Sequence, residues 1–407
     1  MTRPTSVGEL PGPLRADAVV VGGGIVGAAI AHHLAATGFG SVVLCEQGQV
    51  PGQGATTRSG GLLRLHHTAH ADTRLAARSL PVFEHWADLI GGDCGYRRTG
   101  FLMLVGEKYA AHLDANVAAV LAAGGRSERL DLPEVLALYP GLDLDGVGAA
   151  AYEPEGGYAD PAAATRSLTA AARALGVTVG NGVQVRRLLV ERGRVAGAET
   201  NVGRLEAPVV VLAGGAWAGE LAREAGVDVP VAARRIGLAL ARLPGAGRWG
   251  SEHSLPTCID DTTGSYFRPD GPDRFYFGVP SHPDVRLGLE VEPLTPQELT
   301  SARAAVARRA PAAAGAPLIG TRAGFDGYTP DRRPVIGPAG PDGLYLAVGF
   351  SGGGFKTAPA VAELAVAEIT AGGAVAGRAG EPLLQPYRLE RFAAERPIIP
   401  EAGYERM

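Results

Sequence analysis

Three glycines and a carboxylate near the start of the chain have the types and the spacing of a nucleotide-binding site. Gly22, Gly24 and Gly27 form a G-x-G-x-x-G pattern, and Glu46 follows 19 residues after the last glycine. The first glycine permits a tight turn, the second lets the backbone approach a pyrophosphate, and the third lets a helix pack closely on a strand. A carboxylate at this distance accepts hydrogen bonds from a ribose diol, so the pattern favours NAD or FAD over NADP.

Cations occur in two glycine-rich segments that could reach the same site. Arg58 and Arg64 lie in a loop rich in glycine and hydroxyl residues, where they either meet a phosphate, a flavin edge or an acidic substrate, or are solvated. Lys356 follows the glycine-rich stretch 349–354. The chain has only two lysines, Lys108 and Lys356, among 38 basic residues, which suggests that Lys356 stands where a compact ammonium is needed. The alternative for Lys356 is a surface position at a helix start.

Histidines and cysteines give no pattern typical of a metal site. His66, His67 and His70 lie close together, but a metal needs a fixed geometry and usually a carboxylate or thiolate ligand as well. We therefore expect surface or pocket-lining histidines and predict no metal. The three cysteines are odd in number, far apart and form no C-x-x-C pair, which fits a cytoplasmic protein without disulfides or zinc.

Hydrophobic patterns predict the elements that must hold these residues. Residues 17–21 form a β-branched run typical of a buried parallel strand, 25–36 a helix whose first N–H groups face the phosphates, and 41–45 a second strand. Near the end of the chain, 344–348 is predicted as a buried strand and 357–369 as a helix. The glycine-rich loop between them directs the positive dipole end of a helix at an anionic group, such as the pyrimidine side of a reduced flavin.

The middle of the chain predicts a second kind of sheet. Strand-like runs alternate with Pro and Gly turns over residues 231–320, which favours antiparallel pairing. Most aromatic residues of this region should be core and one or two could line a pocket; they are Tyr266, Phe267, Phe275, Tyr276 and Phe277. Val183 and Val185 either pack on an adenine or belong to the core. The remaining predicted elements are helices at 72–89, 108–123, 131–139, 161–175 and 296–309, the last of them exposed, and strands at 100–105 and 209–212.

Composition indicates a globular protein with more than one domain. The 407 residues are 46% hydrophobic and 20% charged, enough for two or three domains. A formal net charge of −4 gives no reason to expect nucleic acid or an anionic membrane as a partner. No apolar run reaches transmembrane length, and the polar, proline-rich residues 1–15 are expected to form a short disordered arm rather than a signal peptide.

Three stretches together resemble the FAD-dependent D-amino acid oxidase superfamily. They are VVVGGGIVGAAIAHHLA with VVLCEQ near the start, VVVLAGGAW in the middle, and YTPDRRPVIG with LYLAVGFSGGGFK near the end. Within the superfamily, the chain most resembles the branch of monomeric sarcosine oxidase, N-methyltryptophan oxidase and glycine oxidase. The resemblance implies an α/β fold with a discontinuous, Rossmann-like FAD-binding domain (16–95, 150–230 and 321–390) and an α+β substrate domain with a mixed or antiparallel sheet (96–149 and 231–320).

The same resemblance implies an activity. Relatives oxidise the C–N bond of an amino acid or of a secondary, N-methyl or cyclic amine to an imine, by transfer of a hydride or its equivalent to flavin N5, with O₂ as the expected acceptor giving H₂O₂. Three alternatives stay open: a dehydrogenase with another acceptor, a flavin-bearing subunit of a larger complex without its own turnover, and an NAD-dependent dehydrogenase, which would leave FSGGGFK unexplained. The oligomeric state and the substrate cannot be predicted.

Catalytic roles follow from the resemblance residue by residue. Arg64 falls where the branch has an arginine that grips the substrate carboxylate, and Lys356 falls where it has a second carboxylate-binding cation. Tyr276 falls where the sarcosine oxidases have an oxygen-activating lysine. Because tyrosine carries no positive charge near neutral pH, the cation for oxygen would have to be Lys356, Arg58 or a protonated histidine.

The positions that carry covalent flavin in relatives differ here. Asp326 and Gly327 stand where one branch has its tethering cysteine, and Arg58 stands where the dimethylglycine dehydrogenase branch has its histidine, so we predict non-covalent FAD. The residues expected to contact FAD are Gly22, Gly24, Ile25, Val26, Gly27, Glu46, Thr57, Arg58, Ser59, Gly61, Leu62, Val183, Gly214, Trp217, Gly352, Gly353, Gly354, Phe355 and Lys356.

Overall fold

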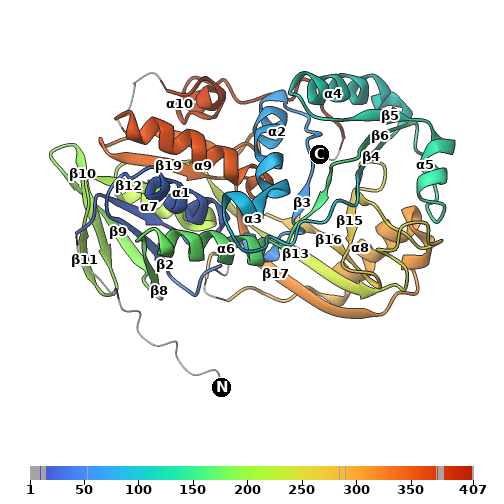
Figure 1. The fold of residues 1–407 in the computed structure, drawn as a ribbon, viewed down its shortest axis with the longest axis horizontal. Helices are drawn as coiled ribbons and strands as arrows, with labels where there is room; N and C mark the ends of the chain where they lie inside the picture. The colour runs from blue at the N-terminus through green and yellow to red at the C-terminus, as the bar shows by residue number, and fades with distance from the viewer. Residues whose placement is uncertain are drawn as a thin grey trace.

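The computed structural model describes most of the chain. The described residues are 10, 15–52, 54–283, 285–288, 290–372, 374 and 380–405. Apart from Leu10 and Arg15, the arm predicted at residues 1–15 lies outside the described residues. The described chain forms two large sheets that lie side by side, with helices α2 (His70–Glu84) and α3 (Trp86–Leu89) between them (Figure 1).

A six-stranded sheet contains the predicted nucleotide-binding strand. In spatial order its strands are β18 (Val335–Pro338), β19 (Leu344–Val348), β12 (Val209–Leu212), β1 (Ala18–Val21), β2 (Val42–Glu46) and β8 (Thr178–Asn181). All neighbours pair in parallel except β18 and β19. All four residues of β1 are buried, because a β-branched run of this kind is covered on both faces.

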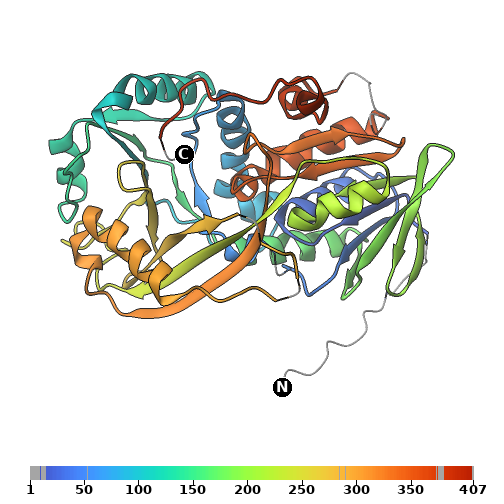
Figure 2. The ribbon, with the colours of Figure 1, turned by 180° about the vertical axis from the view of Figure 1, so that it is seen from behind.

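Alternate residues of β1 face two different layers. Ala18 and Val20 pack in one apolar cluster with α1 (Ile25–Ala36) and α9 (Gly354–Thr370), whereas Val19 and Val21 pack in a second cluster. Helices α2 and α6 (Pro161–Ala174) complete the first layer through contacts with α9 and α1. The second layer comprises α7 (Ala218–Glu224), β9 (Val185–Glu191), β10 (Arg194–Thr200) and β11 (Gly203–Glu206), and Figure 2 shows it from behind.

An eight-stranded sheet forms the other half of the molecule. In spatial order its strands are β17 (Leu318–Tyr328), β13 (Ala232–Arg242), β16 (Arg274–His282), β15 (Ser265–Pro269), β14 (Thr257–Asp260), β4 (Phe101–Val105), β6 (Ala149–Glu153) and β5 (Glu128–Leu130). Only β4 and β14 pair in parallel, so the sheet is mixed and the predicted fold class is confirmed. Phe267, Phe275 and Phe277 lie in its core.

Several predicted elements have different bounds in the structure. The helix expected at 72–89 is interrupted at His85, and the helix expected at 357–369 begins three residues earlier, at Gly354 inside the glycine-rich loop. The other elements are α4 (Ala110–Ala122), α5 (Leu132–Leu138), α10 (Glu390–Ala393), β3 (Leu62–Leu63) and β7 (Gly157–Tyr158). The domain boundaries stay a prediction: the eight-stranded sheet includes residues 150–153 and 321–328, which the predicted boundaries assign to FAD-binding segments.

No helix within the described ranges is both long and apolar enough for a membrane crossing.

The prediction that helix 296–309 is exposed holds for only one part of its surface. Helix α8 (Pro296–Arg309) begins with a capping box between Thr295 and Glu298 and lies against β15 and β16. Its last residue, Arg309, is only 1% exposed, and its Nε lies 2.8 Å from Oδ2 of Asp260. The guanidinium also donates to the carbonyl of Asp143. An arginine-rich helix end is normally solvated, so this buried ion pair could not be predicted from the local pattern.

Replacing Arg309 should therefore destabilise the protein strongly. Arg309→Met leaves the buried Asp260 carboxylate without its cation, and we expect the free energy of unfolding to fall by about 3–5 kcal/mol. The matched control is Arg308→Met at the neighbouring exposed residue, which should stay within about 0.5 kcal/mol. Urea unfolding followed by circular dichroism measures both variants, and equal losses in the two would contradict the role given to the ion pair.

Candidate functional site

A cavity of about 880 Å³ lies where the two sheets meet. Its walls come from the ends of β1 and β2, the loop after β2, the loop before α9, and parts of β13, β16 and β17. A smaller cavity of about 280 Å³ shares wall residues with it, including Arg64, Tyr266, Tyr328 and Lys356. The two cavities are therefore adjacent, and the two predicted substrate-binding cations stand in the wall between them.

The glycine motif brings β1 and α1 together without side chains. Gly22 has φ +110°, and a Cβ there would lie 2.4 Å from the carbonyl oxygen of Ala213. A Cβ on Gly27 would lie 1.9 Å from the carbonyl oxygen of Gly22. Gly24 precedes α1 and lines the larger cavity, as do the first two residues of the helix. The helix N-terminus thus opens on the cavity, where its N–H groups suit a pyrophosphate.

Glu46 stands at the end of β2 in the same wall. Its Oε2 accepts the N–H of Gly23 and its Oε1 accepts the N–H of Gly48, each at 2.8 Å. Burial raises the pKa of the carboxyl, while the two backbone donors oppose this effect. Since each carboxylate oxygen has a second lone pair, both retain an acceptor site for a ribose hydroxyl.

Thr56, which lies in the same hydroxyl-rich loop as the predicted Thr57, bonds to the helix N-terminus, whereas Thr57 does not. Oγ1 of Thr56 accepts the N–H of Ile25, the first residue of α1, at 3.1 Å, and Thr56 lines the larger cavity. Oγ1 of Thr57 instead donates to the carbonyl of Gly52 at 3.3 Å, and Thr57 is absent from the described residues that line the cavity. In a short 3₁₀ turn adjacent side chains point in different directions, and the sequence does not show which one turns inward.

Arg64 and Lys356 are brought together from opposite ends of the chain. The Arg64 guanidinium donates to the carbonyl of His66 and lies 5.7 Å from the ring centre of Phe101. Burial lowers its pKa to about 10. Lys356 is buried, and its Nζ donates to the carbonyl of Gly352 at 3.3 Å. Burial and the nearby Arg64 lower the pKa of Lys356 to about 7, so its charge is easily changed near neutral pH.

The C-terminal segment supports Arg64, a contact that nothing in the sequence indicated. Tyr404 places its hydroxyl 2.7 Å from Nε2 of His66, whose backbone carbonyl accepts from Arg64. Asn116 on α4 donates to the same hydroxyl at 2.8 Å. The chain end, α4 and the loop after β3 therefore fix one another behind the arginine.

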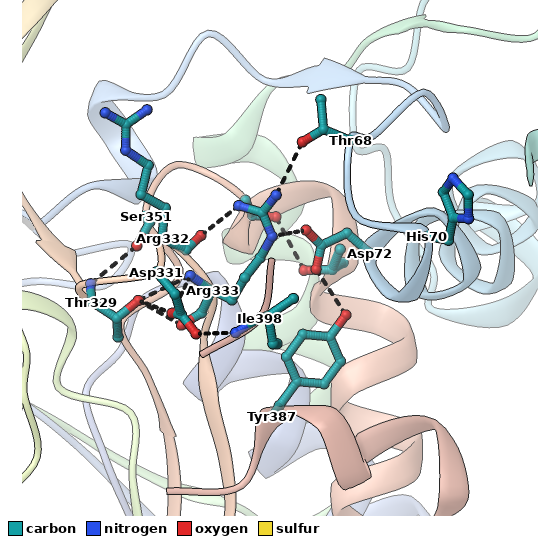
Figure 3. A network of polar contacts seen from close by, with 12 residues as sticks. Thr68, His70, Asp72, Thr329, Asp331, Arg332, Arg333, Ser351, Tyr387 and Ile398 are labelled. Atoms are coloured by element: carbon teal, nitrogen blue, oxygen red, sulfur yellow. Dashed lines mark hydrogen bonds and ion pairs between the residues drawn. The ribbon is translucent and has the colours of Figure 1, made fainter. Parts of the chain in front are cut away.

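A network of charged side chains fixes the loop after β17 (Figure 3). Nε of Arg333 lies 2.6 Å from Oδ2 of Asp72 on α2, and the hydroxyl of Tyr387 donates to the same carboxylate at 2.8 Å. Asp331 pairs with Arg391 at 2.8 Å. Arg333 and Asp72 both line the smaller cavity. Because they form an ion pair, their opposite charges cancel each other in its wall.

Tyr276, predicted at the oxygen site, lies beneath two arginines in the eight-stranded sheet. Arg268 lies 4.6 Å and Arg322 5.7 Å from its ring centre, and Tyr276 is not among the described wall residues of either cavity. Tyr266 lines both cavities instead, with its ring packed against Gly278. Strand β15 pairs Arg268 with Tyr276, so the arginine covers the tyrosine across the sheet.

His66 and His67 supply no cation to this region. Burial lowers the pKa of His66 to about 3, and burial together with Arg64 and Lys356 holds the pKa of His67 well below its usual value. His67 lines the smaller cavity as a neutral ring. Across the part of the chain that the structure describes, no group of three or more His, Cys, Asp or Glu side chains is arranged to hold a metal ion.

Most of the predicted cofactor residues share the larger cavity. Those in its wall are Gly22, Gly24, Ile25, Val26, Glu46, Arg58, Ser59, Gly61, Leu62, Val183, Gly214, Trp217, Gly352, Gly354, Phe355 and Lys356. Gly353 lines only the smaller cavity, and Gly27 acts through packing. Val183 and Val185 belong to an apolar cluster and also line the cavity, and their packing on an adenine stays a prediction.

Comparison with known proteins identifies the family. The model of the FAD dependent oxidoreductase family matches residues 17–368, and the chain belongs to this family, as predicted. Glycine oxidase from Pseudomonas putida is 29% identical over 379 residues, which cover 90% of this chain and 96% of that protein. The solved structure of L-proline dehydrogenase from P. horikoshii has a TM-score of 0.82 at 27% identity, covering 94% of this chain and 99% of that one.

Other relatives are longer than this chain. The 4-methylaminobutanoate oxidase (formaldehyde-forming) of Paenarthrobacter nicotinovorans is 30% identical over 381 residues, which cover 88% of this chain but 44% of that protein. The match to mouse sarcosine dehydrogenase, 28% identical, covers 84% of this chain and 38% of that protein. The chain thus spans less than half the length of these two relatives.

The residues of the cavity fit FAD. Helices α1 and α9 both start at the cavity. Their N-cap residues, Gly24 and Gly353, are glycines and therefore have no side chain that could occupy the first N–H groups. One N-terminus suits the pyrophosphate and the other suits an anionic part of the flavin. Glu46 adds the acceptor for a ribose, and no side chain stands at Gly22 or Gly24 to block the backbone.

Replacing each of the two neighbouring threonines by valine in turn should distinguish their roles. Thr56→Val removes a hydroxyl that lines the cavity and links the loop to the start of α1, and we expect FAD to bind about tenfold more weakly. Thr57→Val changes a side chain outside the wall and should change the FAD dissociation constant less than about threefold. Quenching of flavin fluorescence on binding to apoprotein measures both. If Thr57→Val lost more FAD affinity than Thr56→Val, Thr57 rather than Thr56 would be the residue that supports FAD binding.

Proposed function

We propose that the chain oxidises the C–N bond of an amino acid or of a secondary amine to an imine, with FAD as its cofactor. The observation that carries this proposal is the pairing of Arg64 and Lys356, two cations from distant parts of the chain, in the wall of the cavity that fits FAD. Two cations on one carboxylate fix the orientation of a small substrate, because charge-assisted hydrogen bonds are strong and directional.

The relatives support this substrate class. The names of three of them specify glycine, sarcosine and 4-methylaminobutanoate, which are all amines that carry a carboxylate. FAD, when bound, supplies the acceptor for the two electrons and the hydrogen that leave the carbon next to nitrogen. The chain's own residues bind and orient the substrate: Arg64 is held by the carbonyl of His66, and Lys356 by the carbonyl of Gly352.

The cofactor is proposed to be non-covalent. Neither Arg58 nor Asp326, which line the cavity at the positions of the relatives' tethers, has a side chain that bonds covalently to a flavin. The Nε of Arg58 donates instead to the carbonyl of Ala323 at 3.2 Å.

Acid precipitation of the yellow holoprotein should then release all of its flavin into the supernatant, where absorbance measures it. Colour that remains in the washed pellet would contradict non-covalent binding, and mass spectrometry of that pellet would locate the attached residue.

Molecular oxygen is the proposed acceptor, with slower reoxidation than in relatives that carry the oxygen-activating lysine. Lys356, with a pKa of about 7, is partly charged at neutral pH and is a candidate cation for oxygen, whereas His66 and His67 are neutral. A dehydrogenase with another acceptor is the second candidate. The observation that favours it is the place of Tyr276, beneath Arg268 and outside both cavity walls within the described structure.

Anaerobic titration tests the proposed function. A panel of N-methyl, cyclic and primary amino acids is added to the holoprotein, and at least one should bleach the flavin band. Stopped-flow mixing of the reduced protein with oxygenated buffer then measures reoxidation and peroxide. Stoichiometric peroxide at the rate of turnover supports the oxidase. Faster turnover with an artificial acceptor and no peroxide supports the dehydrogenase, and a band that no amine bleaches contradicts both.

A further inference from the structure

The wall of the larger cavity contains a buried carboxylate, Asp326, that has no role in binding or orienting the substrate in the proposed function. Asp326, in β17, is 8% exposed and lines the larger cavity. Its Oδ1 accepts the N–H of Gly327 at 2.8 Å, and the N–H of Gly352 forms a second backbone hydrogen bond with the carboxylate. Burial raises its pKa to about 6, so the side chain is still ionised at neutral pH.

The negative charge of Asp326 has no direct partner. In the described structure no arginine, lysine or histidine nitrogen lies within 4 Å of its carboxylate oxygens. Lys356 is the cation whose charge acts on it, from a greater distance. A buried carboxylate is costly unless it is paired or hydrogen-bonded, and here the backbone partners leave part of its hydrogen-bonding capacity unused, in a residue that lines the cavity.

Asp326 and Lys356 lie on either side of one residue. Gly352 gives its N–H to the Asp326 carboxylate and receives the Lys356 ammonium on its carbonyl, 3.3 Å from Nζ. The backbone of Gly352 therefore holds an acid and a cation apart at a fixed spacing, both in the wall of the same cavity.

We propose that Asp326 accepts a hydrogen bond from the amine of the substrate while Arg64 and Lys356 bind its carboxylate. The site then recognises both charged ends of one small molecule, and its substrates are amines that carry a carboxylate on or near the same carbon. Amines without a carboxylate, and carboxylates without an amine, bind weakly. This inference rests on the proposed function and adds to it the residue that recognises the amine.

Three probes of the same shape test the proposal on the FAD-loaded protein. They are 2-aminoisobutyrate, which has both groups, 2,2-dimethylpropanoate, in which a methyl replaces the amine, and tert-butylamine, in which a methyl replaces the carboxylate. None has a hydrogen on its central carbon, so none can be oxidised to an imine there, and calorimetry and the flavin absorption spectrum report binding alone.

The wild-type protein should bind 2-aminoisobutyrate about 10- to 100-fold more tightly than 2,2-dimethylpropanoate, as expected for a hydrogen bond to a buried charged group. In Asp326→Asn the ratio should fall to within about threefold, mainly because 2-aminoisobutyrate binds more weakly. Asp326→Ser gives the same result if Asp326→Asn does not fold. Lys356→Met should weaken both carboxylate probes and keep their ratio. Glu220→Gln, which removes another carboxylate from the same cavity wall, is the control and should leave the ratio unchanged.

Two results would overturn the assignment. One is a wild-type protein that binds 2-aminoisobutyrate no better than 2,2-dimethylpropanoate, and the other is an Asp326 variant that folds, holds FAD and keeps the wild-type ratio. Both are distinct from failure of the proposed function, because in either case an amino acid of the activity panel can still bleach the flavin. If no member of that panel bleaches it, the proposed function itself fails, whatever the probes show.

Discussion

The close approach of α1 to the end of β1 is the constraint on which the site depends. With no side chain on Gly22 or Gly27, the helix starts against the backbone of the strand, and Gly22 lies against the carbonyl of Ala213 after β12. Helix α1 then packs on α9, which places the second helix N-terminus at the same cavity. A methyl group at Gly27, 1.9 Å from a carbonyl oxygen, would displace this whole arrangement.

Charge balance explains why the cations of the site remain available. Asp72 and Arg333 compensate each other, and the hydroxyl of Tyr387 completes the bonding of that carboxylate. Arg64 and Lys356 donate mainly to backbone carbonyls, which carry no net charge. The positive charges of Arg64 and Lys356 are therefore not neutralised by these contacts. They lie where a substrate carboxylate binds in the proposed function.

Local patterns made the nucleotide-binding half predictable. The helix predicted at 25–36 has these same bounds in the structure, and the strand at 17–21 differs by one residue. Both are set by neighbouring residues: a β-branched run, glycines at a turn that few other residues can form, and small residues in the helix. The family resemblance was equally local, since its motifs are the turns that meet the cofactor, and it was confirmed over residues 17–368.

The sequence by itself thus determined the fold class, the FAD-dependent family and a set of cofactor residues, most of which line the larger cavity. Tertiary structure decided which side chains face that cavity: Thr56 rather than Thr57, and Tyr266 rather than Tyr276. It also decided that Arg309 is buried and that Tyr404 supports His66. These outcomes depend on strand register, on the turn of a short loop and on contacts between residues hundreds of positions apart. A shift of one residue along a strand reverses the face of a side chain, and no local pattern records that choice.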